Sequence, residues 1–478
     1  MDRRTSENTR RIYVDLDGTL IATDLLWESL RGLIRTRFLA LLLLPVWAFR
    51  GRAFLKRQLA NCVFLNPSTL PFRKDVLDYL RQRKNEGDTL VLATAADERL
   101  AGRIADYLQL FDSVIASDGK TNCKGVRKLR LVRQHSGSAA FDYVGDSAAD
   151  LPLFAAAEKA IVVYPTPRTL KRVRGVCSPD YVFQTSSVRL RDFAALIRVH
   201  QWSKNFLLAV PLLTSHRVGD FVRIFHCGLG FLALCLMASS GYIINDFLDL
   251  AADRIHPNKR SRPLASGRIR ISSALTTSAI LFIAAVGMSL MLPAPFTVLL
   301  VVYLVTSLAY SLYIKRKLLL DVICLAGLYT YRILLGGVTV AVVLSPWLLA
   351  FSMFLFLSLA FLKRYAEFSR NGGSAEQLSG RGYVASDVTL VGTVGPSCGL
   401  VCVLVFCLYI NSPDAAKLYH NPILLWLICP VLLYWITRMW FVACRQEIFD
   451  DPVLFAMRDR TSLLALSIMG LLAIAASL

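Results

Sequence analysis

Long apolar runs fill the chain after about residue 205, and they constrain its fold more than any other feature. A helix needs about 20 predominantly apolar residues to cross a bilayer, and run after run approaches that length. We expect nine membrane helices, the first of them short, with cores near 204–215, 225–245, 272–290, 294–313, 319–338, 342–362, 389–410, 422–441 and 461–477. The sequence therefore predicts an all-α polytopic membrane domain over residues 204–478.

Residues 1–185 follow a different pattern, in which short apolar strands alternate with helical segments. Such alternation is typical of a parallel α/β sheet. The expected strands are Arg11–Asp15, Thr89–Thr94, Asp142–Gly145 and Ala160–Tyr164. We therefore expect a Rossmann-like α/β domain over residues 1–185, followed by a linker over residues 186–203.

A helix-rich insertion, at about residues 22–85, separates the first two expected strands. It contains Phe38–Phe49, an apolar run between arginines that is too short to cross a bilayer and includes a proline. This run could lie in the membrane interface, or it could be a buried helix of the insertion. The sequence leaves both interpretations open.

The formal charge of +20 fits a membrane protein better than a nucleic-acid-binding one. Lysine and arginine collect in the even-numbered loops between the expected helices, whereas the opposite loops hold little beyond Arg217 and Lys417. The positive-inside rule then makes the even-numbered loops and the N-terminal domain cytoplasmic. No apolar signal segment follows the N-terminus. We expect a multi-pass protein of a bacterial-type inner (plasma) membrane, with its polar motifs on the cytoplasmic side.

Polar clusters follow the ends of the first three expected strands. They read Asp15-Leu16-Asp17-Gly18-Thr19, Thr94-Ala95-Ala96-Asp97 and Gly145-Asp146-Ser147. Because the carboxyl ends of strands in open α/β sheets form the ligand crevice, the clusters should converge on one site. One carboxylate there can attack phosphorus and a second can transfer the proton. A lysine, a hydroxyl and Mg²⁺ can neutralise the phosphoryl charge.

The ordered motifs DLDGT, LATAA, DGKTNCKG and GDSAAD resemble the haloacid dehalogenase-like (HAD) phosphatase superfamily over about residues 10–165. The resemblance implies that Asp15 is the nucleophile, that Asp17 is the acid/base, and that the insertion is a helical cap. It implies phosphoryl contacts from Thr94 and Lys124. It also implies one Mg²⁺ bound by a set of carboxylates, Asp15, Asp17, Asp146 and Asp150, the last of which supports the metal or Lys124.

The second expected membrane helix ends in three carboxylates, Asp246, Asp249 and Asp253. Their spacing of three and four residues places them on one helical face. Acids at a membrane boundary are costly without a cation, and carboxylates suit Mg²⁺ that also binds substrate phosphates. The cation-rich segment His256–Gly267 follows at once. The sequence therefore predicts a diphosphate site with at least one Mg²⁺.

Asn245–Asp253 is similar to the NDxxDxxxD signature of the UbiA prenyltransferase superfamily, and Gln201–Asn205 fits it too. The resemblance covers roughly residues 195–478 and implies nine membrane helices with a site open to the cytosol. Aromatic prenyltransferases carry a second acidic motif after the sixth helix. Here the corresponding loop, Phe361–Glu367, is rich in cations instead.

That loop, the Tyr310–Lys315 segment and Pro452–Asp459 look like the decaprenyl-phosphate phosphoribosyltransferase branch. The resemblance implies that Asp246 and Asp249 are catalytic and that they bind Mg²⁺ with Asp253. The implied substrate-binding residues of this domain are Lys204, Asn205, Asn245, Lys259, Arg260, Arg262, Tyr310, Lys315, Arg332, Lys363 and Arg364. For Tyr310, Lys315 and Arg332, a packing or loop-charge role stays open.

Together the two predicted sites form a short pathway. The membrane domain would transfer 5-phosphoribosyl from phosphoribosyl diphosphate to polyprenyl phosphate, and the HAD domain would remove the 5-phosphate. We expect these two ligands and the membrane as partners, and no nucleic acid. Chain length of the lipid and homo-oligomer formation stay open. One alternative is a prenyltransferase with an aromatic or other acceptor beside a separate small-molecule phosphatase. The other is a transporter, which the lack of a mid-membrane acid argues against.

Overall fold

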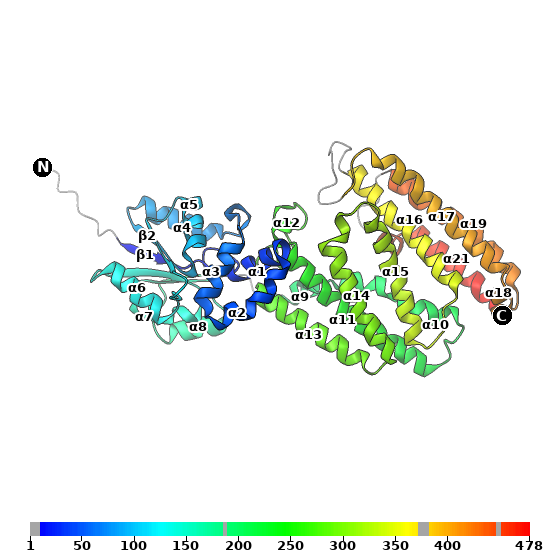
Figure 1. The fold of residues 1–478 in the computed structure, drawn as a ribbon, viewed down its shortest axis with the longest axis horizontal. Helices are drawn as coiled ribbons and strands as arrows, with labels where there is room; N and C mark the ends of the chain where they lie inside the picture. Colours follow the sequence, from blue (N-terminus) through cyan, green and yellow to red (C-terminus); the bar gives the residue numbers. More distant parts are fainter. Residues whose placement is uncertain (1–9, 185–188, 371–381, 446–450) are drawn as a thin grey trace. The chain divides into compact units, whose positions relative to one another are not determined.

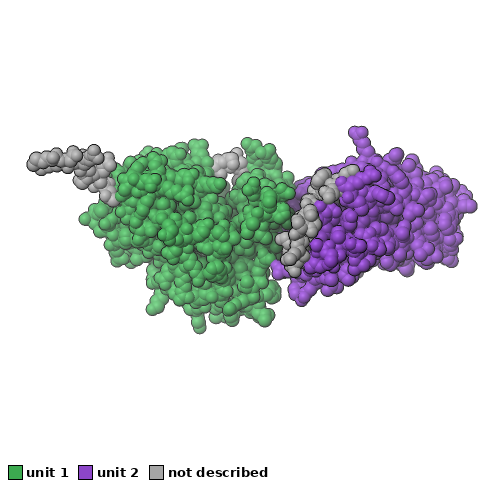
Figure 2. All heavy atoms as spheres, turned by 90° about the horizontal axis from the view of Figure 1, so that it is seen from above, with its two compact units in different colours: residues 1–196, 246–276 green, residues 197–245, 277–478 purple. Residues whose placement is uncertain are grey.

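The computed structural model describes residues 10–184, 189–370, 382–445 and 451–478. The chain divides into two compact units, which Figure 2 shows in different colours. The first unit contains residues 1–196 and 246–276, and the second contains residues 197–245 and 277–478. The aspartate-rich segment after the second expected membrane helix thus belongs to the same compact unit as the α/β domain.

A six-stranded parallel sheet forms the centre of the first unit, in the order β3-β2-β1-β4-β5-β6. The strands are β1 (Arg11–Val14), β2 (Thr89–Asp97), β3 (Ser113–Ser117), β4 (Phe141–Gly145), β5 (Ala160–Val163) and β6 (Tyr181–Phe183). All five strand pairings are parallel. The predicted parallel α/β domain is confirmed.

Helices cover both faces of the sheet (Figure 1), and alternate residues of its strands belong to two different cores. Ile12 and Val14 of β1 share a core with α4 (Lys74–Asn85) and α5 (Glu98–Leu108). Tyr13 faces the other way and shares a core with helices on the opposite face. Those helices are α6 (Val126–Ser136), α7 (Leu151–Ala156) and α8 (Pro167–Arg174). Burial on both faces explains why these strands are continuously apolar.

The insertion between β1 and β2 is helical. It consists of α1 (Leu25–Thr36), η1 (Phe38–Leu43), α2 (Leu44–Phe49), α3 (Arg52–Cys62) and η2 (Pro67–Thr69), followed by α4. Leu33 of α1 and Leu59 of α3 join the same core as the sheet. No side chain of η1 or α2 is fully buried, so the interpretation of Phe38–Phe49 as a buried helix is wrong.

Eight helices of the described residues are long and apolar enough to cross a membrane, so the chain is a multi-pass integral membrane protein. They are α11 (Phe221–Leu248), α13 (Ile271–Ser289), α14 (Ala294–Leu312), α15 (Leu320–Thr339), α16 (Pro346–Arg370), α17 (Asp387–Ile410), α19 (Ile428–Cys444) and α21 (Arg460–Ser477). Shorter helices connect or precede them. These are α9 (Leu190–Leu196), η4 (Val199–Ala209), α10 (Val210–Thr214), α12 (Leu250–Ile255), η5 (Ile314–Arg316), α18 (Pro413–Leu418), η6 (Pro422–Leu427) and α20 (Pro452–Ala456).

The prediction of nine spans is corrected to eight over the described residues, because the expected first span, 204–215, does not form one long helix. Its residues fall in η4 and in α10, which is only five residues long. Pro211 lies in the first turn of α10, where proline is tolerated, but a longer helix running through this position would lose its N–H donor. η4 instead packs on α15, and Gly336 permits this approach, because a Cβ there would overlap the Leu208 carbonyl.

Candidate active sites

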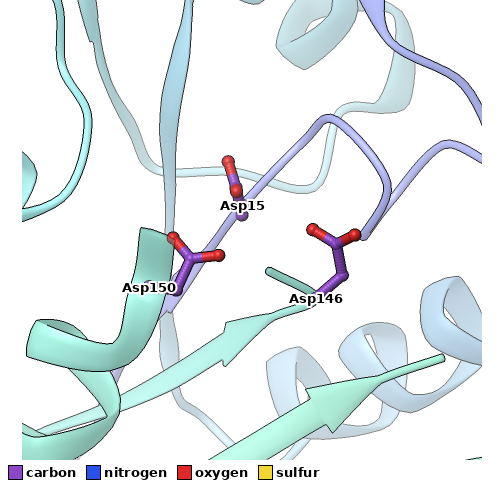
Figure 3. A group of neighbouring side chains, drawn as sticks. All are labelled: Asp15, Asp146 and Asp150. Atoms are coloured by element: carbon purple, nitrogen blue, oxygen red, sulfur yellow. The ribbon is translucent and has the colours of Figure 1, made fainter. Parts of the chain in front are cut away.

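Three buried carboxylates meet at the carboxyl end of the sheet. Asp15 follows β1, Asp146 follows β4, and Asp150 lies at the end of a short 3₁₀ helix (η3, Ala148–Asp150). Figure 3 shows the three side chains around one point. One oxygen from each lies within 4.8 Å of the others, and all three residues are buried. Because β1 and β4 are adjacent and parallel, this convergence follows from the sheet, as predicted.

A tight turn after β1 brings its backbone close to Asp146. Gly18 has a φ of +78°, and a Cβ at this position would overlap the Asp146 carboxylate. Glycine is therefore required by both the backbone conformation and the space. The Thr19 hydroxyl donates to Asp146 Oδ1 at 3.5 Å, and the Asp15 N–H donates to the Val144 carbonyl at 2.9 Å. These contacts fix the two carboxylates relative to each other.

Lys128 is the lysine that contacts the carboxylates. Its Nζ lies 3.0 Å from Asp15 Oδ1 and 3.3 Å from Asp150 Oδ1, and the side chain is buried. The predicted phosphoryl ligand, Lys124, lies four residues earlier, before α6, and is exposed. Sequence reasoning missed Lys128, although this lysine lies only four residues after the motif lysine Lys124 and was a second candidate for the same role. Burial alone would lower the Lys128 pKa, but Asp15 and Asp150 raise it.

The carboxylates repel one another in a poorly solvated site. Burial raises the pKa of Asp15 to about 6, with Lys128 opposing the shift and Asp150 adding to it. Burial also raises the pKa of Asp146 to about 7, with further contributions from Asp15 and Asp150. Asp150 has a lowered pKa, since Lys128 and three hydrogen bonds outweigh its burial. The site therefore carries more negative charge than its neighbours neutralise, which is what a divalent cation would correct.

Asp17 faces a narrow chamber under the insertion. Burial and the nearby charge of Asp24 raise the pKa of Asp17 well above its ordinary value, although the Leu25 N–H donates to it at 2.9 Å. The chamber is lined by Asp17, Leu25, Leu26, Ser29, Lys56, Leu59, Ala96, Asp97 and Leu100. Lys56, from α3, donates to the Ala95 carbonyl at 2.6 Å and was not predicted. Thr94 is fully buried and accepts the Ala96 N–H at 3.1 Å.

The first unit also contains the acids Asp246, Asp249 and Asp253. α11 ends just before Asp249, and α12 begins just after it. Arg262 bridges two of the acids, at 3.0 Å from Asp246 and 2.6 Å from Asp253. The predicted single helical face for all three acids is wrong, because the helix is interrupted at Asp249. Asp249 lies 4.0 Å from Arg35 of α1. Across the described residues, only the Asp15 group brings three metal-ligating side chains within 4.8 Å.

Several contacts join the α/β domain to the Asp246–Thr276 segment within this unit. Arg254 pairs with the buried Glu28 of α1 at 2.7 Å, and Arg31 pairs with the same carboxylate at 3.3 Å. Arg270 reaches Asp146 Oδ2 at 3.4 Å. A hollow of about 810 Å³ also lies there, and its cationic lining residues are Lys74, Arg81, Arg254 and Arg260. Neither Arg270 nor Glu28 was singled out by the sequence analysis.

The second unit has a buried cluster of opposite charges. Lys204 and Lys363 both lie 2.9 Å from Asp451 Oδ2, and the Tyr329 hydroxyl donates to Asp451 at 3.2 Å. Burial raises the pKa of Asp451, but the two lysines outweigh it and hold that pKa well below its usual range. Sequence reasoning missed Asp451, because its one local role is to cap α20 through the Val453 N–H.

Two further predicted cations are buried among helices. Arg332 donates to Asn205 Oδ1 at 3.0 Å and to the Tyr303 hydroxyl at 2.8 Å. Arg364 is fully buried and pairs with Asp321 at 2.7 Å and with Glu367 at 2.5 Å. It also donates to the Tyr310 hydroxyl at 3.3 Å. These contacts connect neighbouring helices, and the substrate-binding role of Arg332 and Tyr310 stays a prediction beside them.

The remaining predicted residues lie at the edges of these clusters. Lys315 lies in η5. Lys259 is half-buried, and its charge opposes the rise in the pKa of Asp253 that burial causes. Asn245, at the start of the aspartate-rich motif, has a buried Oδ1 without a hydrogen-bond partner in the described structure. Buried amide oxygens are normally paired, so this atom is a candidate ligand contact.

Comparison with known proteins identifies both parts. The model of the UbiA prenyltransferase family matches residues 206–458, and that of the haloacid dehalogenase-like hydrolases matches residues 12–155. Both families depend on Mg²⁺, which the buried carboxylate group of the first unit suits. The matched residues include all the predicted catalytic acids.

Curated relatives cover one or both parts. The uncharacterized protein y4nM of Sinorhizobium fredii is 38% identical over 469 residues, which is 94% of this chain and 88% of that protein. Nodulation protein NoeC of Azorhizobium caulinodans is 32% identical over 59% of this chain and 92% of its own. Decaprenyl-phosphate phosphoribosyltransferase of Mycolicibacterium smegmatis is 34% identical over 43% of this chain and 67% of its own. The chain thus belongs to the UbiA prenyltransferase family and carries a haloacid dehalogenase-like hydrolase domain joined to it.

Proposed function

We propose that the chain makes a ribosylated polyprenyl phosphate in two steps. The membrane domain, residues 204–478, transfers 5-phosphoribosyl from phosphoribosyl diphosphate to polyprenyl phosphate. The HAD domain, residues 1–185, then hydrolyses the 5-phosphate to give polyprenyl-phosphoryl ribose, and residues 186–203 link the two. The similarity to decaprenyl-phosphate phosphoribosyltransferase supports the first step, and the buried carboxylate group supports the second. Both sites face the cytosol in this proposal.

The phosphatase step uses the two aspartates of the first turn in different protonation states. The Asp15 carboxylate attacks phosphorus, the bond to the ribose 5-oxygen breaks, and Asp17 donates a proton to that oxygen. The raised pKa of Asp17, caused by its burial, favours the protonated form that this step requires. Water then attacks the aspartyl-phosphate, Asp17 takes its proton, and inorganic phosphate leaves. Lys128 favours the Asp15 carboxylate throughout because its ammonium is 3.0 Å away.

Asp15, Asp146 and Asp150 fit Mg²⁺, since they offer hard oxygen ligands from three chain segments within 4.8 Å. Bound there, the ion would neutralise phosphoryl charge. Thr94, within the neighbouring strand β2, would donate its hydroxyl to the phosphoryl group. A contact between Lys124 and the phosphoryl group stays a proposal, whereas Lys128 is the lysine that contacts Asp15.

In the transferase, Asp246, Asp249 and Asp253 would hold the diphosphate of the donor through Mg²⁺, and Arg262 would move from these acids to the phosphates. Lys204 and Lys363 would bind phosphate groups of donor or acceptor. As the diphosphate leaves, the anomeric carbon gains positive character, and an oxygen of the lipid phosphate attacks it. The 5-phosphoribosyl group is thereby transferred, and diphosphate is released.

Lipid mass spectrometry tests both steps in one reaction. Purified full-length protein receives phosphoribosyl diphosphate, polyprenyl phosphate and Mg²⁺. We expect ribosyl-lipid from the unaltered chain, phosphoribosyl-lipid from Asp15→Asn, and no lipid-linked sugar from Asp246→Asn. A ribosyl-lipid from Asp15→Asn would exclude the HAD domain as the phosphatase of this product. If no variant makes lipid-linked sugar, the membrane domain does not catalyse this transfer, and the prenyltransferase alternative returns.

A further inference from the structure

An apolar patch is exposed on the helical insertion of the first unit. η1 and α2 present six apolar side chains that are half to almost fully exposed. They are Phe38 (64%), Leu39 (79%), Leu42 (77%), Leu43 (49%), Val46 (51%) and Phe49 (94%). Six such side chains within twelve residues are far more than scattered surface apolar residues would explain. We call these six residues the cap patch.

The cap patch is held in place from behind. Leu41, Leu44 and Trp47 lie between its members and pack against the core of the α/β domain. The segment is therefore two-sided, with one side anchored to the domain and the other directed outward. The outward apolar face is therefore held in one position on the domain, as in a helix that lies in a membrane interface.

The surroundings of the patch are positively charged. Exposed arginines flank it on both sides, at Arg35, Arg37, Arg50 and Arg52. The sequence has no acidic residue between Glu28 and Asp75. A second copy of this chain would bring a like-charged rim against it, which is unfavourable. Anionic lipid headgroups around an apolar bilayer interior complement both the charge and the apolar centre.

The first unit is also connected to the membrane by its own chain. Its segment Asp246–Thr276 includes the last residues of α11 and the first residues of α13, and both of these helices are long and apolar enough to span a bilayer. The twelve residues Phe38–Phe49 would be at most about 18 Å long as a helix, which is too short to cross the bilayer's hydrocarbon core of about 30 Å. They can insert only into its interface.

We propose that the cap patch inserts into the cytoplasmic interface of an anionic bilayer and selects lipid-anchored phosphate monoesters for the phosphatase site. α1 and α3, which precede and follow the patch, supply Ser29, Lys56 and Leu59 to the chamber that Asp17 faces. A cap held at the lipid surface would thus bring this chamber close to lipid headgroups. The selection of lipid substrates rests on the proposed phosphatase function, whereas the insertion does not.

Photo-crosslinking tests the insertion directly. The full-length protein carries p-benzoylphenylalanine at Phe49 and is reconstituted in nanodiscs containing phosphatidylglycerol. Tyr107 of α5, which is 52% exposed, serves as the control position. We expect a protein-phospholipid adduct, seen as one added lipid mass, from position 49 and none from position 107. Adducts between two protein chains at position 49, or no lipid adduct there, would overturn the insertion.

Kinetics test the selection of substrate. Leu39→Gln combined with Leu42→Gln should raise the KM for a bilayer-embedded phosphoribosyl-lipid about tenfold. Hydrolysis of water-soluble p-nitrophenyl phosphate should stay unchanged, which also shows that the variant is folded. Val176→Gln, at a 49% exposed site outside the insertion, is the matched control and should change neither activity. An equal loss on both substrates, or no change in KM for the lipid, would overturn the selection. An unaltered chain that crosslinks to lipid but does not hydrolyse the phosphoribosyl-lipid would refute the proposed function instead.

Discussion

A buried lysine, Lys128, lies between two carboxylates and opposes the rise in the pKa of Asp15, the proposed nucleophile. Replacing Lys128 by methionine keeps much of the side-chain volume but leaves Asp15 and Asp150 without their shared cation. We expect a 10²- to 10³-fold lower kcat, on the order found when one charge-stabilising group of an active site is removed. The acid limb of the pH profile should also move upward, because the pKa of Asp15 rises further.

The matched control is Lys124→Met, four residues earlier and exposed. Phosphate release measured across pH 5 to pH 9 should show a smaller loss and no movement of the acid limb. If the two variants lose activity equally, Lys124 binds the phosphoryl group as the family resemblance implies, and Lys128 has only a structural role.

Protons compete with Mg²⁺ at the buried carboxylates. Asp146 has a pKa raised to about 7 without the metal, and that of Asp15 is raised to about 6. Both groups therefore gain protons as the pH falls below these values, and a metal must displace them. From Asp146 alone, half-maximal phosphatase activity should need about tenfold more Mg²⁺ at pH 6 than at pH 8. Saturating Mg²⁺ should restore most of the activity at pH 6, and a requirement that does not change with pH would contradict this coupling.

At the level of single residues, the sequence predicted that the carboxylates after β1 and β4 would lie together, because parallel strands end at one edge of the sheet. Asp15, Asp146 and Asp150 are brought together by a parallel sheet that apolar runs already predicted. Lys128 was missed because a helix turn separates it from the motif lysine. Asp451 was missed because a lone acid before a short helix looks like a cap, and only the fold brings Lys204 and Lys363 to it.

Helix α1 contributes a buried ionic contact to the first unit. Glu28 is 1% exposed and pairs with both Arg31 and Arg254. Glu28→Gln would leave two largely buried guanidinium groups without their carboxylate, which should destabilise this unit by about 3–5 kcal/mol. Scanning fluorimetry of the full-length protein in detergent should show the earlier thermal transition.

The matched control for that contact is an exposed ion pair on α4. Asp78→Asn removes the partner of Arg81, and the two side chains are 70% and 61% exposed. Exposed pairs contribute little, so its transition should stay within about a degree or two of the unaltered protein. Equal shifts for both variants would mean that Glu28 and its arginines are no more important than surface charges.

The Asp451 cluster predicts a ligand-dependent stability. Asp451→Asn leaves Lys204 and Lys363 beside each other without a shared anion, so the unliganded protein should melt earlier. Pyrophosphate should then raise the melting temperature more in this variant than in the unaltered protein, because it supplies the missing negative charge. Asp414→Asn, on the exposed start of α18, should show neither effect. A pyrophosphate response that Asp451→Asn leaves unchanged would argue against phosphate binding by these lysines.

Among elements, long and strongly apolar segments were predictable and short ones were not. The eight spans and the strands at the centre of the sheet follow from apolar runs. The edge strands β3 and β6 are short and partly exposed, so their patterns are weak. The 204–215 region has membrane-like composition, but Pro211 and packing on α15 divide it between η4 and α10.

For the whole molecule, charge distribution and motif order predicted two enzymatic parts, and both family matches agree with that division. What no local pattern could indicate is that the aspartate-rich segment of the UbiA-family part packs with the haloacid dehalogenase-like domain. That association depends on single contacts such as Arg254 with Glu28 and Arg270 with Asp146. Ion pairs between residues so far apart in the sequence depend on the tertiary fold, so no sequence periodicity predicts them.

The shared unit of residues 1–196 and 246–276 limits how this protein can be divided. A gene split after residue 196 would produce an N-terminal fragment whose buried Glu28 has lost Arg254, and a membrane fragment whose aspartate-rich segment has lost its contacts with the α/β domain. Each fragment would expose residues that are buried in the intact chain. Separating the two activities into independent genes would therefore require compensating substitutions on both sides of the break, so this fusion should be difficult for evolution to reverse.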